Sequence, residues 1–263
     1  MNKKAMSETM VILLIFVLGA IILFNFSGKL STFFKEDSDI ETCRLSVLAQ
    51  SQTRNIPVVN VGTPGTIVPL DCPRRILKVF EDKVEIKDKK STKYKFKKLS
   101  EDDINNLVAE ELRLCWYRMA EGKRNIFENS WIFGDPYTCL ICSEIQFDDE
   151  LKGKSYGGLL EYLKSRKIPK SDISYFAYLI RSQNNIHLLW GRLPWAQWTP
   201  WGYGTTDKID KDDKINTNDK YSIYFIAYKP SFASQVTKAY TQSSYIGLKI
   251  EEKLTEECHI QVN

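Results

Sequence analysis

Residues 137–147 read YTCLICSEIQF, and the pairing of this stretch with the rest of the chain decides the fold. It contains no glycine or proline, and its first half is apolar, as expected for a strand that is buried on both faces. A second apolar stretch, YSIYFIAY at residues 221–228, predicts another strand. Two cysteines, Cys139 and Cys142, lie inside the first stretch, so its pairing bears on chemistry as well as on architecture.

Shorter elements are expected on both sides of this stretch. Lysines alternate with aromatic residues over 93–97, the period-two pattern of a half-buried strand. Other short strands are predicted at residues 76–80, 83–87, 245–251 and 258–262. Short helices are predicted after Gly158 and from Ser171 to Ile180, whereas residues 183–220 lack regular periodicity. Strands and helices that do not alternate strictly indicate an α+β fold.

The clearest helix is predicted to begin at Ser100. Serine is a favourable N-cap, and Asp103 stands where the acid of a capping box is found. Gly122 supplies a stop signal. Apolar residues recur between these points at helical spacing: Ile104, Leu107, Val108, Leu112, Cys115 and Met119. Cys115 is therefore expected on the buried face of this helix.

The chain has an even number of cysteines, which indicates a disulfide framework in an oxidising compartment. The six disulfide candidates are Cys43, Cys72, Cys115, Cys139, Cys142 and Cys258. Six cysteines allow many complete pairings, and the sequence alone does not choose among them.

The Cys139-x-x-Cys142 motif has three interpretations. A thioredoxin-like redox pair normally opens a helix, where the thiol pKa is lowered. A zinc site needs a second cysteine pair, for which His187 and His259 are poor substitutes. In a strand, positions three apart are separated by about 10 Å, whereas a disulfide needs Cα atoms within about 7 Å. We therefore favour separate partners for the two cysteines, with Cys115 as a candidate for one of them.

An apolar segment lies near the N-terminus. Residues 10–24 read MVILLIFVLGAIILF, and extending the segment to 8–27 gives about the twenty residues that cross a bilayer core of about 30 Å. Bulky residues stand where signal peptidase needs small ones, so we expect a retained signal anchor in the lipid bilayer. Lys3 and Lys4 before the segment, and cysteines only after it, favour a cell membrane protein with its N-terminus inside and its C-terminal domain outside.

The expected organisation has four parts. They are a cytoplasmic basic segment (1–7), a transmembrane helix (8–27), a polar tether (28–42) and an extracytoplasmic α+β domain (43–263). Residues 43–55, at the start of that domain, are compatible with either a short helix or a loop.

Two resemblances bear on this organisation. Lys3-Lys4-Ala5-Met6-Ser7-Glu8, followed at once by the apolar run, resembles the class III signal segment of archaeal pilin-like proteins. That resemblance implies cleavage after Ala5 and an apolar helix retained as a filament core, although Glu8 stands two residues closer to the cut than the family's glutamate. The Cys115-Trp116 helix and the Cys139-x-x-Cys142 strand are similar to those of uncharacterised, N-terminally anchored membrane proteins of small-genome archaea, which imply no site residues.

Four of the six tryptophans fall within residues 190–201, in a stretch that glycine and proline break too often for a helix or a strand. The binding-loop candidates are Trp190, Trp195, Trp198, Trp201 and Tyr203. These rings suit a protein interface, where tryptophan dominates binding energy, a cell-surface glycan, or the membrane interface. Alternatively, they fold back and cover the core.

The remaining signals exclude several functions. The net charge of +4 argues against a nucleic-acid binder, and the lysines of residues 83–98 suit the solvated face of a sheet. Residues 207–213 are rich in aspartate but lack the glycine and glutamate of an EF-hand. No catalytic, metal or cofactor motif is found.

We therefore expect a non-enzymatic binding or assembly domain. Two alternatives stay open. One is an extracytoplasmic thiol–disulfide oxidoreductase that uses Cys139 and Cys142, and the other is a pilin-like filament subunit.

Overall fold

The computed structural model describes residues 38–52, 70–87, 91–122, 137–180, 187–190, 214–228, 243–251 and 259–260. The chain divides into two units, Met1–Glu41 and Thr42–Asn263, and only the last four residues of the first unit are described. No helix among the described residues has the length and apolarity of a membrane span. The predicted anchor, residues 8–27, lies outside the described ranges.

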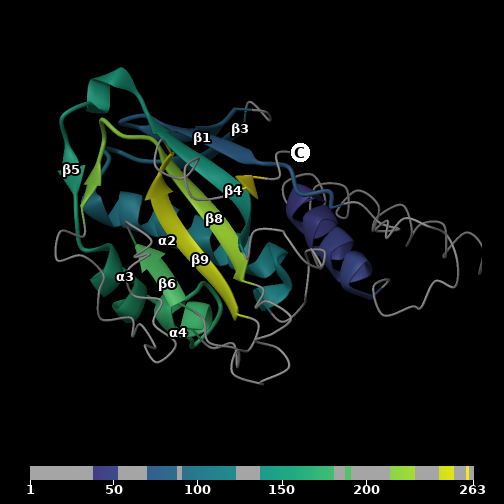
Figure 1. Ribbon diagram of the computed structural model, residues 1–263. Coiled ribbons are helices and arrows are strands. Elements are labelled where there is room, and N and C mark those ends of the chain that lie inside the picture. Colours follow the sequence, from purple (N-terminus) through teal and green to yellow (C-terminus); the bar gives the residue numbers. More distant parts are fainter. Residues whose placement is uncertain are drawn as a thin grey trace, which may run out of the picture. The chain divides into compact units, whose positions relative to one another are not determined.

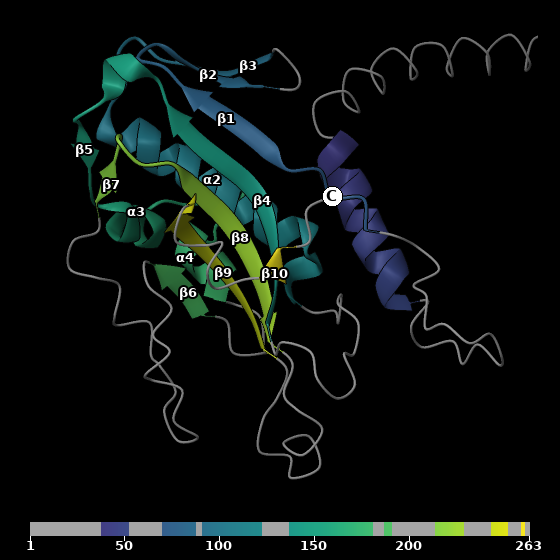
Figure 2. The same ribbon diagram turned by 45° about the horizontal axis from the view of Figure 1, so that its top comes forward.

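The second unit is built on a mixed eight-stranded sheet (Figures 1 and 2). Its strands in spatial order are β3 (Ser91–Lys95), β2 (Lys83–Ile86), β1 (Arg75–Val79), β4 (Tyr137–Phe147), β8 (Tyr221–Tyr228), β9 (Ser243–Ile250) and β6 (His187–Trp190). The eighth strand, β10 (His259–Ile260), is not part of this linear order and pairs with β4. β1 and β10 run parallel to β4, and β6 runs parallel to β9, whereas the other neighbours are antiparallel. The two long apolar strands that the sequence predicts, β4 and β8, are therefore neighbours in the sheet.

Helices cover one face of this sheet. α2 (Glu101–Arg118) crosses the sheet behind β8 and β9 in Figure 1, and the short helices α3 (Leu159–Ser165) and α4 (Tyr175–Ile180) pack against α2. A small two-stranded sheet, β5 (Ser155–Tyr156) with β7 (Ile215–Asn216), lies outside the main sheet. Helices gathered on one side of a largely antiparallel sheet confirm the α+β prediction.

The sequence of α2 explains its start, its end and its buried face. The Ser100 hydroxyl accepts from the Asp103 N–H, and the Asp103 carboxylate accepts from the Ser100 N–H at 2.9 Å, which completes the predicted capping box. The helix ends at Arg118, and Gly122 adopts a left-handed conformation (φ 66°) just beyond it. Every member of the predicted apolar stripe is buried.

The core fills the space between α2 and the sheet. Trp116 of α2 packs against Phe225 of β8, with ring centroids 5.8 Å apart. Arg75 of β1 and Glu111 of α2 add a buried ion pair, with Nη1 and Oε1 3.1 Å apart. Burial of apolar side chains on both layers supplies the main drive for this packing.

Residues 43–52, for which the sequence left a helix or a loop open, are helical, and this helix begins at residue 38, within the segment predicted as a tether. One helix boundary needs correction. α4 begins at Tyr175 rather than near Ser171, because the Ser174 hydroxyl accepts from the N–H of Ala177.

The region 183–220 also contains regular structure that its lack of periodicity concealed. β6 and β7 both fall within it. Each has four residues or fewer and pairs with a strand that is distant in sequence: β6 pairs with β9, and β7 pairs with β5. Strands this short show no usable period.

Candidate functional site

Two disulfides join helices to other parts of the chain, one to β4 and one to the segment before β1. Cys43 is bonded to Cys72, with a sequence separation of 29, and Cys115 is bonded to Cys142, with a separation of 27. These bonds confirm the predictions that the protein contains disulfides, that Cys139 and Cys142 have separate partners, and that Cys115 bonds one of them. Cys139 is also disulfide-bonded. Cys258, the sixth candidate, lies outside the described residues.

A β-bulge brings Cys142 to the helix. The register between β4 and β8 pairs Ile141 with Tyr224 and Ser143 with Ile223, so Cys142 has no opposite residue on β8. The extra residue changes which positions of β4 face the core. Leu140 and Cys142 face the core up to the bulge, and Ile145 faces it after the bulge. Cys142 therefore points to α2 and reaches Cys115 across a Cα–Cα distance of 5.5 Å.

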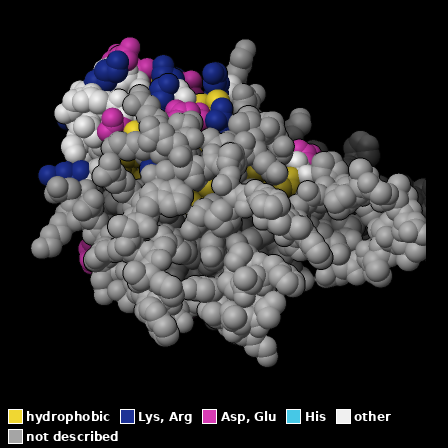
Figure 3. All heavy atoms as spheres, viewed as in Figure 1, with side chains coloured by type: hydrophobic (Ala, Val, Ile, Leu, Met, Phe, Trp, Pro, Cys, Tyr) yellow, Lys and Arg dark blue, Asp and Glu magenta, His cyan; other side chains and the backbone are white. Residues whose placement is uncertain are grey.

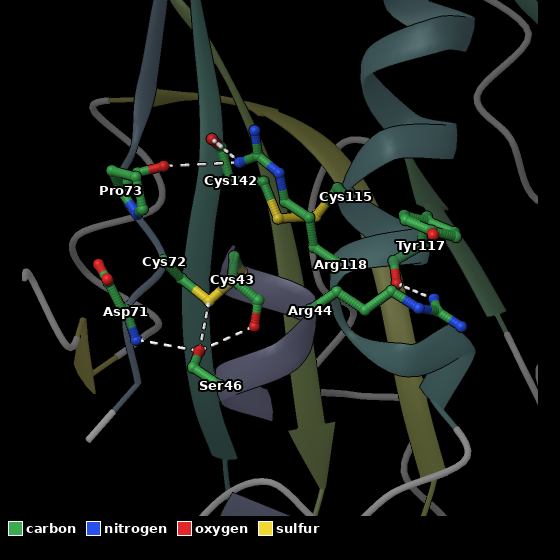
Figure 4. The surroundings of a disulfide bond; sticks show 10 residues. All are labelled: Cys43, Arg44, Ser46, Asp71, Cys72, Pro73, Cys115, Tyr117, Arg118 and Cys142. Carbon is green, nitrogen blue, oxygen red and sulfur yellow. Dashed lines mark hydrogen bonds between the residues drawn. A yellow bond between two sulfur atoms is a disulfide. The ribbon is translucent and has the colours of Figure 1, made fainter. Parts of the chain in front are cut away.

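Arg118 fills an interruption in the pairing of β4. Along one side of that strand, β10 ends opposite Cys139 and β1 begins opposite Ser143. Nη1 of Arg118 donates to the carbonyl of Cys142 at 3.3 Å and to that of Pro73 at 3.5 Å (Figure 4). The side chain is 2% exposed, so its guanidinium satisfies carbonyls that would otherwise be buried without a donor.

The Cys43–Cys72 disulfide has its own polar surroundings, also drawn in Figure 4. The Ser46 hydroxyl donates to the Cys43 carbonyl at 2.8 Å and accepts from the Asp71 N–H at 3.1 Å. The guanidinium of Arg44 donates to the carbonyl of Tyr117 and lies 3.9 Å from the centre of the Tyr117 ring. Covalent and polar contacts thus fasten residues 43–46 to the approach to β1 and to the end of α2.

The redox hypothesis required a Cys139–Cys142 pair at the start of a helix, and that pair is not formed. Cys142 is bonded to Cys115, which lies in the last turn of α2. A helix C-terminus disfavours a thiolate. Both cysteines are also almost fully buried, at 1% and 3% exposure. The arrangement is that of a structural cross-link, because exchange requires access of an attacking thiolate.

The predicted binding loop lies largely outside the described residues. Trp190 is the last residue of β6, which corrects the expectation that no strand enters this stretch. Among the described strands, β6 is the last on its side of the sheet order. Trp195, Trp198, Trp201 and Tyr203 fall in the range that is not described.

The lysine-rich strands carry mixed charge. Lys78 pairs with Asp148 at 2.7 Å and Lys83 pairs with Glu85 at 2.7 Å. The hydrogen bond from Lys78 lowers the pKa of Asp148. In Figure 3, basic and acidic side chains lie side by side in the upper left of the view. This pattern favours the solvated sheet face over a dedicated anion-binding patch.

A buried polar row crosses the face of the sheet opposite α2, and the sequence analysis did not find it. Glu144 of β4 is in register with Ser222 of β8, which is in register with Lys249 of β9. Their exposures are 3%, 0% and 3%. The Ser222 hydroxyl has no hydrogen-bond partner within the described residues. We call Glu144, Ser222 and Lys249 the polar row.

Further charges surround one end of this row. Arg74 Nη1 lies 2.5 Å from Glu144 Oε1. Burial, followed by the effect of the Glu251 carboxyl group, raises the pKa of Glu144, against the opposing effects of Arg74 and Lys220. The row therefore combines an acid, a hydroxyl and an amine in a largely buried setting.

The chemistry open to the polar row is limited by its charges. An acyl transfer by Ser222 would need an uncharged amine as base. Two carboxyl groups on the same face make a buried charge network the better description. No cluster of three or more metal-binding side chains occurs in the part of the chain that the structure describes. A signal for the row existed in the sequence, because Glu144 and Lys249 are polar residues inside predicted strands, but their alignment depends on register.

Comparisons with known proteins give no relative. No family model, no curated protein and no solved structure matches the chain.

Proposed function

We propose that the protein is an outer-surface domain, held in the cell membrane by residues 8–27, that works by binding or assembly rather than by catalysis. The observation that carries the proposal is the pair of buried disulfides, Cys43–Cys72 and Cys115–Cys142. Such bonds form and persist in oxidising surroundings outside the cytoplasm. Together with an apolar segment of membrane-spanning length, they support a domain on the outer side.

The cross-linked core suits a rigid scaffold that presents loops. One disulfide fastens residues 42–52 to the approach to β1, and the other fastens α2 to β4. Binding residues are commonly found on loops that a rigid scaffold positions. The Trp-rich stretch begins at Trp190, the last residue of β6, and it is our candidate for contact with a protein or a cell-surface glycan.

Thiol labelling in intact cells tests the location. Cells that produce the full chain are treated with a membrane-impermeant maleimide, with and without prior treatment by a membrane-impermeant reductant, and the protein is then denatured and its labelled cysteines are mapped. We expect labelled cysteines in the samples treated with reductant and mild denaturant, and none in the samples without reductant. In a parallel sample, cells are lysed and denatured in the maleimide without any reductant. Labelled cysteines in that sample would place the domain in a reducing compartment and end the proposal.

The Trp-rich loop is tested by a triple substitution, Trp195→Ala, Trp198→Ala and Trp201→Ala. If the rings serve binding, the melting temperature should stay within a few degrees of wild type. Trp116→Ala is the matched control, because Trp116 is 1% exposed and packs on Phe225, and its loss should cost about 3–5 kcal/mol. A triple variant as unstable as the control would show that the loop covers the core.

A further inference from the structure

Cys139 lies on the central strand β4, and it is disulfide-bonded. The chain has six cysteines, and four of them form the Cys43–Cys72 and Cys115–Cys142 bonds. Within one chain, Cys258 is therefore the only cysteine that remains for Cys139.

Burial of Cys139 argues against a bond to a second copy of the chain. The residue is 0% exposed. A disulfide brings its two sulfur atoms to about 2 Å from each other, so a cysteine of another molecule could reach Cys139 only if the sheet opened. The partner of Cys139 therefore belongs to the same chain.

β10 brings the C-terminal end of the chain to this part of β4. The two strands run parallel, with His259 in register with Thr138 and Ile260 in register with Cys139. Cys258 directly precedes β10 in the sequence. Two residues span at most about 7 Å, so a small bend of the chain before β10 is enough to bring the Cys258 sulfur to Cys139.

We propose that Cys139 and Cys258 form a third disulfide, which fastens the C-terminal strand β10 to β4. β10 has only two residues, and so short a ladder offers few hydrogen bonds to offset the entropy cost of ordering a chain end. A covalent bond beside it supplies the missing restraint. Cys258 itself lies outside the described residues, so we infer the bond from Cys139, from the register of β10 and from the number of cysteines.

Formation of this bond requires an electron acceptor, for which we name the oxidised form of an extracytoplasmic thiol–disulfide oxidoreductase. One cysteine thiolate attacks the donor disulfide and forms a mixed disulfide, and the second thiolate then displaces the donor. The two thiols lose two protons and two electrons, and the donor leaves as a dithiol. This step requires the oxidising surroundings of the proposed location, so the third disulfide rests on the proposed function.

The burial of Cys139 also sets the order of events. Exchange requires access of a thiolate to the sulfur that it attacks, and Cys139 is inaccessible in the folded chain. The bond therefore has to form before this part of β4 is covered.

Peptide mapping without reductant, on the natively purified full chain, tests the bond. Free thiols are blocked with N-ethylmaleimide in denaturant, and the protein is digested with trypsin and analysed by mass spectrometry. The tryptic peptides that carry the relevant cysteines are residues 114–118 (Cys115), 125–152 (Cys139 and Cys142) and 254–263 (Cys258). We expect these three peptides in one disulfide-linked species. A second digestion with chymotrypsin, which cuts after Leu140, then separates the two bonds in the wild-type protein.

Two variants isolate the bond. In the double variant Cys115→Ala, Cys142→Ala, peptide 125–152 keeps Cys139 as its only cysteine and should be linked to peptide 254–263 alone. Cys139→Ala is the matched control. Its peptide 254–263 should carry the maleimide, while peptides 114–118 and 125–152 stay linked.

The possible results separate this proposal from the proposed location. Maleimide on Cys139 and Cys258, with the other two disulfides intact, would overturn the third disulfide and leave the location standing. Maleimide on all six cysteines would overturn the location as well. A peptide 254–263 linked to a second copy of itself would show that Cys258 bonds another molecule, which also refutes the proposal.

Discussion

The two faces of the central sheet bury their residues in different ways. The face toward α2 is largely apolar, and the buried Arg75–Glu111 ion pair is among its few polar exceptions. A covalent bond between Cys115 and Cys142 joins its two layers. The opposite face buries Glu144, Ser222 and Lys249 in a row, with a hydroxyl that has no partner within the described residues.

The two faces are therefore expected to contribute differently to the free energy of unfolding. Apolar contacts and a disulfide do not depend on pH, so the α2 face should remain packed whenever the chain is folded. A row of buried ionisable groups depends on its protons. We therefore expect large losses from changes on the α2 face and smaller effects from changes on the opposite face.

The largest loss is expected from Glu111→Ala. This substitution leaves Arg75, whose side chain is only 10% exposed, without its ion partner, and removing one member of a buried pair costs about 3–5 kcal/mol. Chemical denaturation measures the free energy of unfolding. The double variant Arg75→Met with Glu111→Leu is the control and should recover most of the loss, because neither charge remains. A single variant within about 1 kcal/mol of wild type would contradict the expected role of the Arg75–Glu111 ion pair.

The next largest effect is expected from the double variant Cys115→Ala, Cys142→Ala. The chain-entropy model gives a loss of about 3–4 kcal/mol for a loop of this size. The Cys43→Ala, Cys72→Ala variant removes a disulfide that closes a loop of similar length. The same model therefore gives a similar loss of unfolding free energy for it. If only the first variant is strongly destabilised, the bulge at Cys142 depends on its cross-link. If neither changes the unfolding free energy, the disulfides do not support the α2 face.

A smaller loss, about 1 kcal/mol, is expected from Ser100→Ala, because the N-cap of α2 loses the hydroxyl that accepts from Asp103. Circular dichroism during thermal unfolding measures it. Glu161→Ala, at an exposed site of α3, should change the unfolding free energy by less than about 0.5 kcal/mol. Equal effects of the two substitutions would show that α2 is held by packing alone.

Local signals account for the parts of the fold that the sequence predicted. α2 carries its own cap, stripe and stop, and β4 and β8 are long enough for composition to indicate a strand. The separate partners of Cys139 and Cys142 followed from strand geometry alone. Each of these inferences needed only residues that are close together in the sequence.

Register and pairing account for the parts that were missed. The bulge at Cys142 exists only as an offset between β4 and β8. Ser222 and Lys249 are 27 residues apart and meet because β8 and β9 pair in one register out of several. β6 has four residues and depends on β9. The polar row therefore could not be read from the sequence, although its acid and its amine were visible inside predicted strands.

The smallest effect is expected from Ser222→Ala. The hydroxyl of this fully buried residue has no partner within the described residues, and burial of an unmatched hydroxyl costs free energy. The substitution should leave the unfolding free energy unchanged or raise it by up to about 1 kcal/mol. Chemical denaturation at neutral pH provides the measurement.

Thr217→Val is the matched control for Ser222→Ala. The Thr217 hydroxyl is also buried, but it donates to the Leu151 carbonyl at 2.6 Å and accepts from the Lys154 N–H at 3.0 Å. Its loss removes both of these hydrogen bonds and leaves the Lys154 N–H and the Leu151 carbonyl with only their 3.3 Å bond to each other, so it should cost about 1–3 kcal/mol. A Ser222→Ala variant that is destabilised as much as Thr217→Val would mean that the Ser222 hydroxyl has a partner in solution, such as a bound water. The contrast between the two faces would then rest on the buried Glu144 and Lys249 alone.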